Sequence, residues 1–124
     1  MKRWLVDGMN VVGSRPDGWW RDREGAKRAL AARLAEFARA TGDEVTVVFD
    51  GRPFEVDEPP VRIDFAPSRA RNAADDEIAR RVDADADPGS IAVVTSDQDL
   101  ASRVRAHGAE VVAAGGFRRR LDAL

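Results

Sequence analysis

The segment VVTSDQDL, residues 93–100, predicts a buried strand that runs directly into two aspartates and then into a helix. The same order, an apolar strand followed by an aspartate, occurs in LVDGMN (5–10) and in VVFDG (47–51). Parallel sheets of α/β proteins bind their ligands just outside the carboxyl ends of the strands. We therefore expect the aspartates of these three segments to meet at one edge of one sheet and to form a functional site.

Short runs of β-branched or aromatic residues alternate with helical patterns along the chain. The predicted strands are 3–6, 45–49, 61–65, 91–95 and 109–113. The predicted helices are 24–40, 72–84 and 99–107, with a short basic helix in the tail 115–124 and a proline-rich loop at 51–60. This alternation predicts a three-layer α/β/α sandwich with a mainly parallel central sheet, in a single domain over residues 1–124. The alternating pattern of 61–65 places that strand near an edge.

Six aspartates are candidates for the acidic site. They are Asp7, Asp50, Asp75, Asp76, Asp97 and Asp99. Helical phase separates the neighbours Asp75 and Asp76, because Asp75 lies within the apolar stripe of its predicted helix and Asp76 lies about 100° away from it. We therefore expect Asp75 to face the sheet and Asp76 to act at most through a water or another ligand.

Each aspartate also has an ordinary structural explanation. Asp-Gly pairs are common turns at strand ends, while Asn72 with Asp75 and Ser96 with Asp99 resemble helix capping boxes. Independent turns and caps need not converge, however, and burying several carboxylates together is unfavourable without a compensating cation. The joint pattern therefore favours a shared metal site over separate turns and caps.

Composition limits which metal could bind. The 124-residue chain has no cysteine and a single histidine, His107, so thiolate zinc sites and multi-histidine sites are excluded. Oxygen ligands suit Mg²⁺ or Mn²⁺. The net charge is -2, and the six aspartates contribute much of the acid. No apolar run approaches the ~18 residues of a membrane span and no signal peptide is recognisable, so we expect a cytoplasmic protein without membrane contacts.

The reaction that best suits an acidic cluster of this kind is metal-assisted phosphodiester hydrolysis. A receiver-type signalling domain would need a lysine after its last strand, and a haloacid-dehalogenase-like phosphatase would need an aspartate where Met9 stands. Gly-rich nucleotide-binding motifs are absent. The alternative that remains open is a non-catalytic RNA-binding or interaction module with a structural metal site.

The segments DGMN, VVFDG, AADDEI and TSDQDL, in this order, resemble the NYN domain of the PIN-like nuclease superfamily, in particular its YacP-like bacterial members. The resemblance implies a Mg²⁺- or Mn²⁺-dependent endoribonuclease that leaves a 5′-phosphate. It assigns metal binding to Asp7, Asp75, Asp97 and Asp99, adds Asn10 to the catalytic residues, and gives supporting roles to Asp50 and Asp76.

The segment RPDGWWRDR, residues 15–23, interleaves aromatic residues with arginines, which suits unstacked bases and phosphates of single-stranded RNA. The predicted RNA-binding residues are Arg15, Trp19, Trp20, Arg21, Arg52, Arg69 and Arg71. Either tryptophan could instead pack as a lid on the core or in a dimer contact. The sequence leaves open a homodimer and presentation of the RNA by a ribosome or another RNA-processing assembly.

Overall fold

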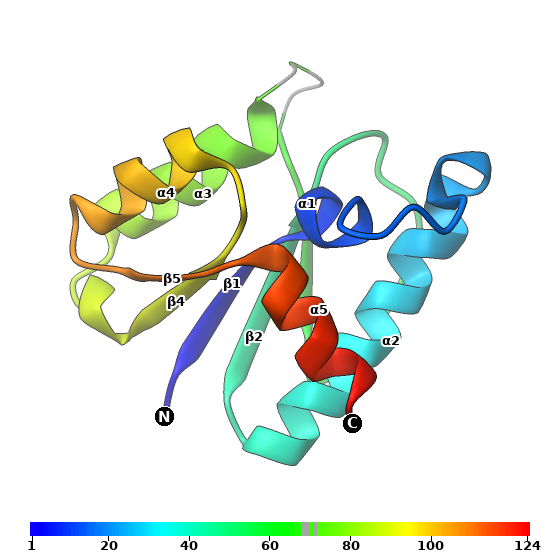
Figure 1. The fold of residues 1–124 in the computed structure, drawn as a ribbon. Coiled ribbons are helices and arrows are strands. Elements are labelled where there is room, and N and C mark those ends of the chain that lie inside the picture. The colour runs from blue at the N-terminus through cyan, green and yellow to red at the C-terminus, as the bar shows by residue number, and fades with distance from the viewer. Residues whose placement is uncertain (68–69, 71) are drawn as a thin grey trace.

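The computed structural model describes residues 1–67, 70 and 72–124, and its centre is a five-stranded sheet (Figure 1). The strands are β1 Arg3–Asp7, β2 Glu44–Phe49, β3 Arg62–Phe65, β4 Ile91–Val94 and β5 Glu110–Val112. They lie in the order β3-β2-β1-β4-β5, and every neighbouring pair is parallel. The predicted sheet is confirmed, including the position of the strand near 61–65 at an edge.

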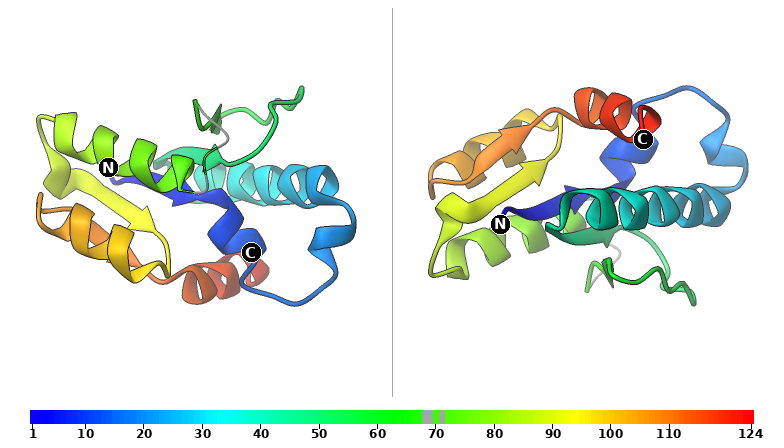
Figure 2. Two further views of the ribbon diagram at one scale, coloured as in Figure 1. Left: turned by 90° about the horizontal axis from the view of Figure 1, so that it is seen from above. Right: turned by 90° about the horizontal axis from the view of Figure 1, so that it is seen from below.

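Helices cover both faces of the sheet. They are α1 Gly8–Val12, α2 Arg23–Thr41, α3 Ala73–Ala84, α4 Gln98–Arg105 and α5 Ala114–Asp122, with 3-10 turns η1 Trp19–Arg21 and η2 Pro88–Ser90. Residues of α1, α2 and α5 pack in one apolar core and residues of α3 and α4 in another. In Figure 1, α3 and α4 lie on one side of β1 and β2, and α2 and α5 lie on the other, and both views of Figure 2 keep these two groups apart in the same way. The predicted α/β/α sandwich is therefore confirmed.

Alternation along β1 explains why both faces of the sheet are buried. Trp4 and Val6 belong to the core under α1, α2 and α5, whereas Leu5 belongs to the core under α3 and α4. Successive side chains of a strand point to opposite faces, so Asp7 continues the row of Leu5. The end of β1 therefore directs a carboxylate toward the α3 and α4 side.

Strand order locates the expected binding edge. The chain passes from β1 outward to β2 and β3, and then returns across the sheet to β4 on the other side of β1. Such a reversal opens a crevice between the carboxyl ends of the two central strands, where α/β proteins bind ligands. Asp7 ends β1, and Asp97 follows β4 by three residues.

Two local features differ from the sequence-based expectation. Residues Gly8–Val12 form a short helix, which was not predicted, and α4 spans Gln98–Arg105 rather than 99–107. The long helix α2 does end where expected, because Gly42 adopts a left-handed conformation with φ 74°. None of the helices within the described residues is long and apolar enough to cross a membrane.

Candidate active site

Asp7 is the most deeply buried acid of the site, with 4% of its surface exposed. The hydroxyl of Thr95 donates a hydrogen bond to Asp7 Oδ2 at 2.9 Å, and Thr95 Oγ1 accepts one from the Asp97 amide at 3.1 Å. Burial raises the pKa of the Asp7 carboxyl to about 7; the Thr95 hydrogen bond opposes this rise, and the charges of Asp75 and Asp50 add to it. Thr95 is not among the predicted site residues, although it begins the TSDQDL segment on which the family resemblance rests.

Asn10 connects the segment after β1 to the loop after β4. Its Oδ1 accepts a hydrogen bond from the Ser96 amide at 2.7 Å, and Ser96 Oγ accepts one from the amide of Ala114 at 2.9 Å. The short helix α1 carries Asn10, so the DGMN segment places both Asp7 and Asn10 beside the loop after β4. Asn10 therefore fixes the loop that carries Asp97.

Asp97 is both a site residue and the cap of α4. Its Oδ1 accepts a hydrogen bond from the Leu100 amide at 2.8 Å. The alternative explanation of Ser96 with Asp99 as a capping box is therefore wrong, because the chain enters the helix one residue later. Asp99 lies exposed in the first turn of α4 and is not among the main groups that shift the pKa of Asp7 or Asp75.

Helical phase correctly separated the two acids of α3. Burial, together with the charges of Asp97, Asp50 and Asp76, raises the pKa of Asp75 to about 6. The Asp76 side chain is 67% exposed and pairs with Arg103 at 2.9 Å. Asn72 makes no side-chain cap to α3, so the alternative explanation of Asn72 with Asp75 as a capping box is also wrong. Asp75 instead lies near the charges of Asp97 and Asp50.

Asp50 connects the site to the two layers of helices. Its Oδ1 accepts a hydrogen bond from the Ala74 amide at 3.1 Å, and its main-chain oxygen accepts one from Lys27 Nζ at 2.6 Å. The charge of Asp50 also raises the pKa of Asp7 and Asp75. Lys27 is not among the predicted site residues, although its spacing to Leu30 and Leu34 places it on the apolar stripe of α2.

The donor chemistry of these acids fits a hard divalent cation. Burial, and after it like charges, raise the pKa of Asp7 and Asp75, which is the effect expected where carboxylates gather without a cation. Within residues 1–67, 70 and 72–124, no three Asp, Glu, His or Cys side chains stand close enough to hold a metal ion unaided. Mg²⁺ often takes only one or two protein carboxylates and completes its coordination with water and substrate phosphate, so two of these acids would suffice.

Comparison with known proteins assigns the chain to a family. The family model of the YacP-like NYN domain matches residues 4–124. The chain belongs to the YacP-like NYN domain family. Two crystal structures of Rae1 (YacP) from Bacillus subtilis, one of them of a mutant, are similar to it, with TM-scores of 0.80 and 0.77 and identities of 28% and 27%. Each match covers 99% of this chain, and 76% and 75% of the respective Rae1 chains.

No significant match is found among curated proteins. Membership of the YacP-like NYN family nevertheless indicates a nuclease-type, RNA-related role. The same match confirms the family resemblance of the DGMN, VVFDG, AADDEI and TSDQDL segments.

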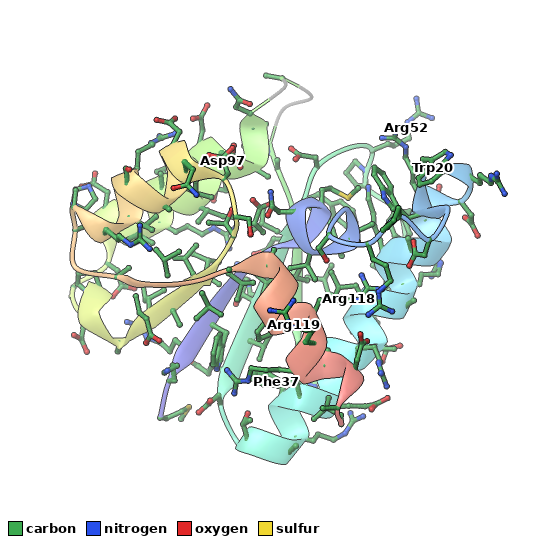
Figure 3. All side chains as sticks on the ribbon, in the orientation of Figure 1. Trp20, Phe37, Arg52, Asp97, Arg118 and Arg119 are labelled. Atoms are coloured by element: carbon green, nitrogen blue, oxygen red, sulfur yellow. The ribbon has the colours of Figure 1, made fainter. Side chains whose placement is uncertain are left out.

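The predicted RNA-binding residues are placed differently from one another. Trp20 is 50% exposed, whereas Trp19 is half-buried against the core, with the guanidinium of Arg23 5.4 Å from its ring centre. Trp19 is therefore the lid that the sequence left as an alternative. Arg21 and Arg52 are exposed, and Trp20 and Arg52 lie at the same end of the fold as Asp97 (Figure 3).

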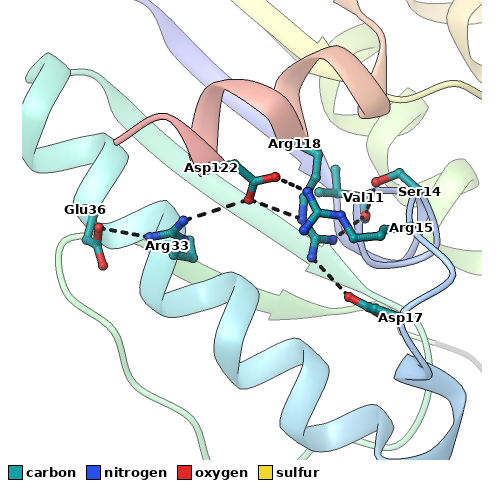
Figure 4. A network of polar contacts seen from close by, with 8 residues as sticks. All are labelled: Val11, Ser14, Arg15, Asp17, Arg33, Glu36, Arg118 and Asp122. Carbon is teal, nitrogen blue, oxygen red and sulfur yellow. Dashed lines mark hydrogen bonds and ion pairs between the residues drawn. The ribbon is translucent and has the colours of Figure 1, made fainter.

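Arg15 belongs to a polar network that ties the loop after α1 to α5 (Figure 4). It pairs with Asp122, while Arg118 donates to the main-chain oxygen of Val11 at 3.2 Å and pairs with Asp17 at 3.4 Å. An RNA contact by Arg15 would compete with this pair. The predicted contacts of Arg69 and Arg71 lie outside the described residues.

Proposed function

We propose that this protein is a Mg²⁺- or Mn²⁺-dependent endoribonuclease that hydrolyses phosphodiester bonds of single-stranded RNA. One observation carries the proposal: carboxylates from four separate segments gather at the carboxyl end of the sheet, where burial and the charges of Asp75 and Asp50 raise the pKa of Asp7, and burial and the charges of Asp97 and Asp50 raise the pKa of Asp75. Carboxylates gathered in this way do not stabilise the folded state, since each negative charge repels the others. The family assignment supports chemistry on RNA at this point.

Two of the four candidate ligands, Asp7, Asp75, Asp97 and Asp99, would hold the cation, and water and substrate phosphate would complete its coordination. When bound, the cation would lower the pKa of a water and balance negative charge on the phosphate. The side chains of the protein supply rigid placement. Thr95 fixes one oxygen of Asp7 and the Leu100 amide fixes one oxygen of Asp97, and each carboxylate retains lone pairs for another partner.

The remaining residues of the site would act on the substrate or on the ligands. Asn10 holds the loop after β4, and Asp50 and Asp76 would support the ligands without binding the cation directly. A carboxylate of the cluster would accept the proton of the attacking water. Trp20, Arg21 and Arg52 offer an exposed aromatic ring and two exposed cations for unpaired bases and phosphates.

The test is cleavage of an end-labelled single-stranded RNA in Mn²⁺ by the wild type and by Asp97→Asn. Asparagine caps helices as well as aspartate, so this variant keeps α4 while losing one charge of the cluster. We expect equal RNA binding in EDTA and loss of cleavage in the variant. Binding without any Asp97-dependent cleavage would instead indicate a non-catalytic RNA-binding module with a structural metal site.

Location and assembly are part of the proposal. We place the protein in the cytoplasm, where its RNA would be found. A homodimer, or presentation of the RNA by a ribosome or another RNA-processing assembly, would be detected by light scattering and by co-sedimentation with ribosomes.

A further inference from the structure

Lys27 is a buried cation that the proposed chemistry does not use. It lies on α2 with 6% of its surface exposed. An ammonium group is strongly hydrated, and its burial is unfavourable unless it is paired and hydrogen-bonded. Lys27 Nζ, which lies near the end of β2, therefore needs a hydrogen-bond acceptor within the fold.

That partner is the main chain of Asp50. Lys27 Nζ donates to the Asp50 carbonyl oxygen at 2.6 Å. At the next residue, Gly51 has φ 97°, and a Cβ there would lie 3.0 Å from Lys27 Nζ. A left-handed glycine therefore allows the backbone to approach the ammonium group closely.

Two aromatic rings enclose the same ammonium group. Its Nζ lies 5.7 Å from the ring centre of Phe49 and 5.8 Å from that of Phe54, which belongs to the loop after β2. Burial lowers the pKa of Lys27, and the charge of Asp50 opposes that shift. Helix α2, the end of β2 and the following loop thus meet at one side chain.

Asp50 also contacts α3, on the opposite face of the sheet from α2. Its carboxylate accepts the amide of Ala74 in the first turn of α3, and Asp75 is the next residue. From these contacts, and resting on the proposed function, we infer that Lys27 is a positioning residue that fixes Asp50 and, through Asp50, the start of α3 and the Asp75 carboxylate. Lys27 does not touch the reacting atoms in this role.

The decisive variant is Lys27→Met, which keeps the length of the side chain and removes its donors. Arg28→Met is the matched control, because Arg28 is the exposed neighbour on α2 and its guanidinium also lies over Phe54, 4.8 Å from the ring centre. The substitution removes the same charge and the same kind of ring contact but leaves the hydrogen bond from Lys27 to Asp50 in place. The readouts are hydrogen exchange of the Ala74 amide and Mn²⁺ affinity measured by calorimetry. Neither depends on RNA cleavage, so both remain informative if the proposed activity fails.

We expect Lys27→Met to expose the Ala74 amide to exchange and to weaken Mn²⁺ binding by roughly 10- to 100-fold, the effect typical of losing a group that orients metal ligands. Arg28→Met should match the wild type in both measurements. If RNA is cleaved, kcat should fall in Lys27→Met while KM stays within about twofold, since uniform substrate binding is untouched. Wild-type exchange and wild-type Mn²⁺ affinity in Lys27→Met would overturn the inference.

A double variant separates positioning from general stabilisation. Asp50→Ala removes the carboxylate that holds α3, so Lys27→Met should weaken Mn²⁺ binding little further in an Asp50→Ala background. Additive losses would refute a path through Asp50. Should Lys27→Met not fold, Lys27→Arg would replace it, because the larger guanidinium keeps the charge but cannot place a donor at the same point.

The chain contains no cysteine, which permits a chemical rescue. Lys27→Cys, alkylated with bromoethylamine while unfolded and then refolded, carries a close analogue of lysine at this position alone. Mn²⁺ affinity should return to within about threefold of the wild type, well inside the loss expected for an absent orienting group. Failure of the modified protein to bind Mn²⁺ better than unmodified Lys27→Cys would contradict the role of the ammonium group.

Discussion

Asp7→Asn should stabilise the metal-free protein at pH 8 and leave its stability at pH 4 almost unchanged. Burial raises the pKa of Asp7 from 3.8 to about 7 in the folded protein. The folded state therefore keeps its proton to higher pH than the unfolded state, and stability falls as pH rises from about 4 through about 7. A shift of about 3 units corresponds to roughly 4 kcal/mol, at about 1.4 kcal/mol per unit.

The size of the gain depends on what asparagine retains. Its side-chain oxygen can still accept the hydrogen bond from Thr95, so the packing changes little while the buried charge is removed. Allowing for relaxation around the charge, we expect the variant to be more stable than the wild type by about 2–4 kcal/mol at pH 8. Since Asp75 remains in both proteins, the difference in stability between them reports Asp7 together with its repulsion by Asp75.

The assay is urea unfolding in EDTA at a series of pH values from 4 to 8, repeated with Mn²⁺. Saturating Mn²⁺ should narrow or reverse the difference in stability between the variant and the wild type. A cation that binds only the folded wild type adds about 2.7 kcal/mol to its free energy of unfolding at one hundred times its Kd. A difference between variant and wild type that stays constant over this pH range would refute the assignment of a raised pKa to Asp7.

Three further perturbations test the fold and the RNA surface. Gly8→Ala should lower stability by about 1–3 kcal/mol in thermal unfolding, because the added Cβ would overlap the ring of Phe49; unchanged stability would argue against this packing. Glu77→Gln should cost about 1 kcal/mol at pH 7 and nearly nothing near pH 2, since Arg80 first and then Arg81 lower the pKa of Glu77 to about 2. In an RNA cleavage assay, Trp20→Ala should raise KM with little change in kcat. The factor should correspond to the loss of one stacked base, which is worth roughly 1–3 kcal/mol; a fall in kcat alone would contradict a binding role.

Local sequence patterns were sufficient where a feature depends on residues close together. The strand ends of Asp7, Asp50 and Asp97 follow from short apolar runs, and the inward orientation of Asp75 follows from the period of one helix. Because the strands are parallel, their carboxyl ends lie at the same edge of the sheet, and no contact between distant residues has to be predicted to bring these aspartates together. The fold class and the ranking of Asp75 above Asp76 were accessible for this reason.

Features that depend on distant segments were not accessible. The hydrogen bond from Thr95 to Asp7 spans 88 positions and exists only because β4 lies beside β1. The five-residue helix α1 is too short for a periodic pattern to predict it. Capping of α4 by Asp97 rather than Ser96 depends on a one-residue difference in where the chain turns, and such boundaries are poorly determined by sequence.

The most direct measurement is the single-turnover rate of single-stranded RNA cleavage in Mn²⁺ by the wild type, Asp75→Asn and Asp76→Asn. The two variants remove the same charge from adjacent residues of α3, but only Asp75 is turned toward Asp97 and Asp50, whereas Asp76 is exposed and paired with Arg103. We expect Asp75→Asn to lose at least about 100-fold in rate, because the roughly 10- to 100-fold range applies to residues that only orient metal ligands, and Asp76→Asn to stay within about tenfold of the wild type. Absence of Mn²⁺-dependent cleavage by the wild type, or equal rates for the two variants, would contradict an RNA-cleaving metal site built on Asp7, Asp75 and Asp97.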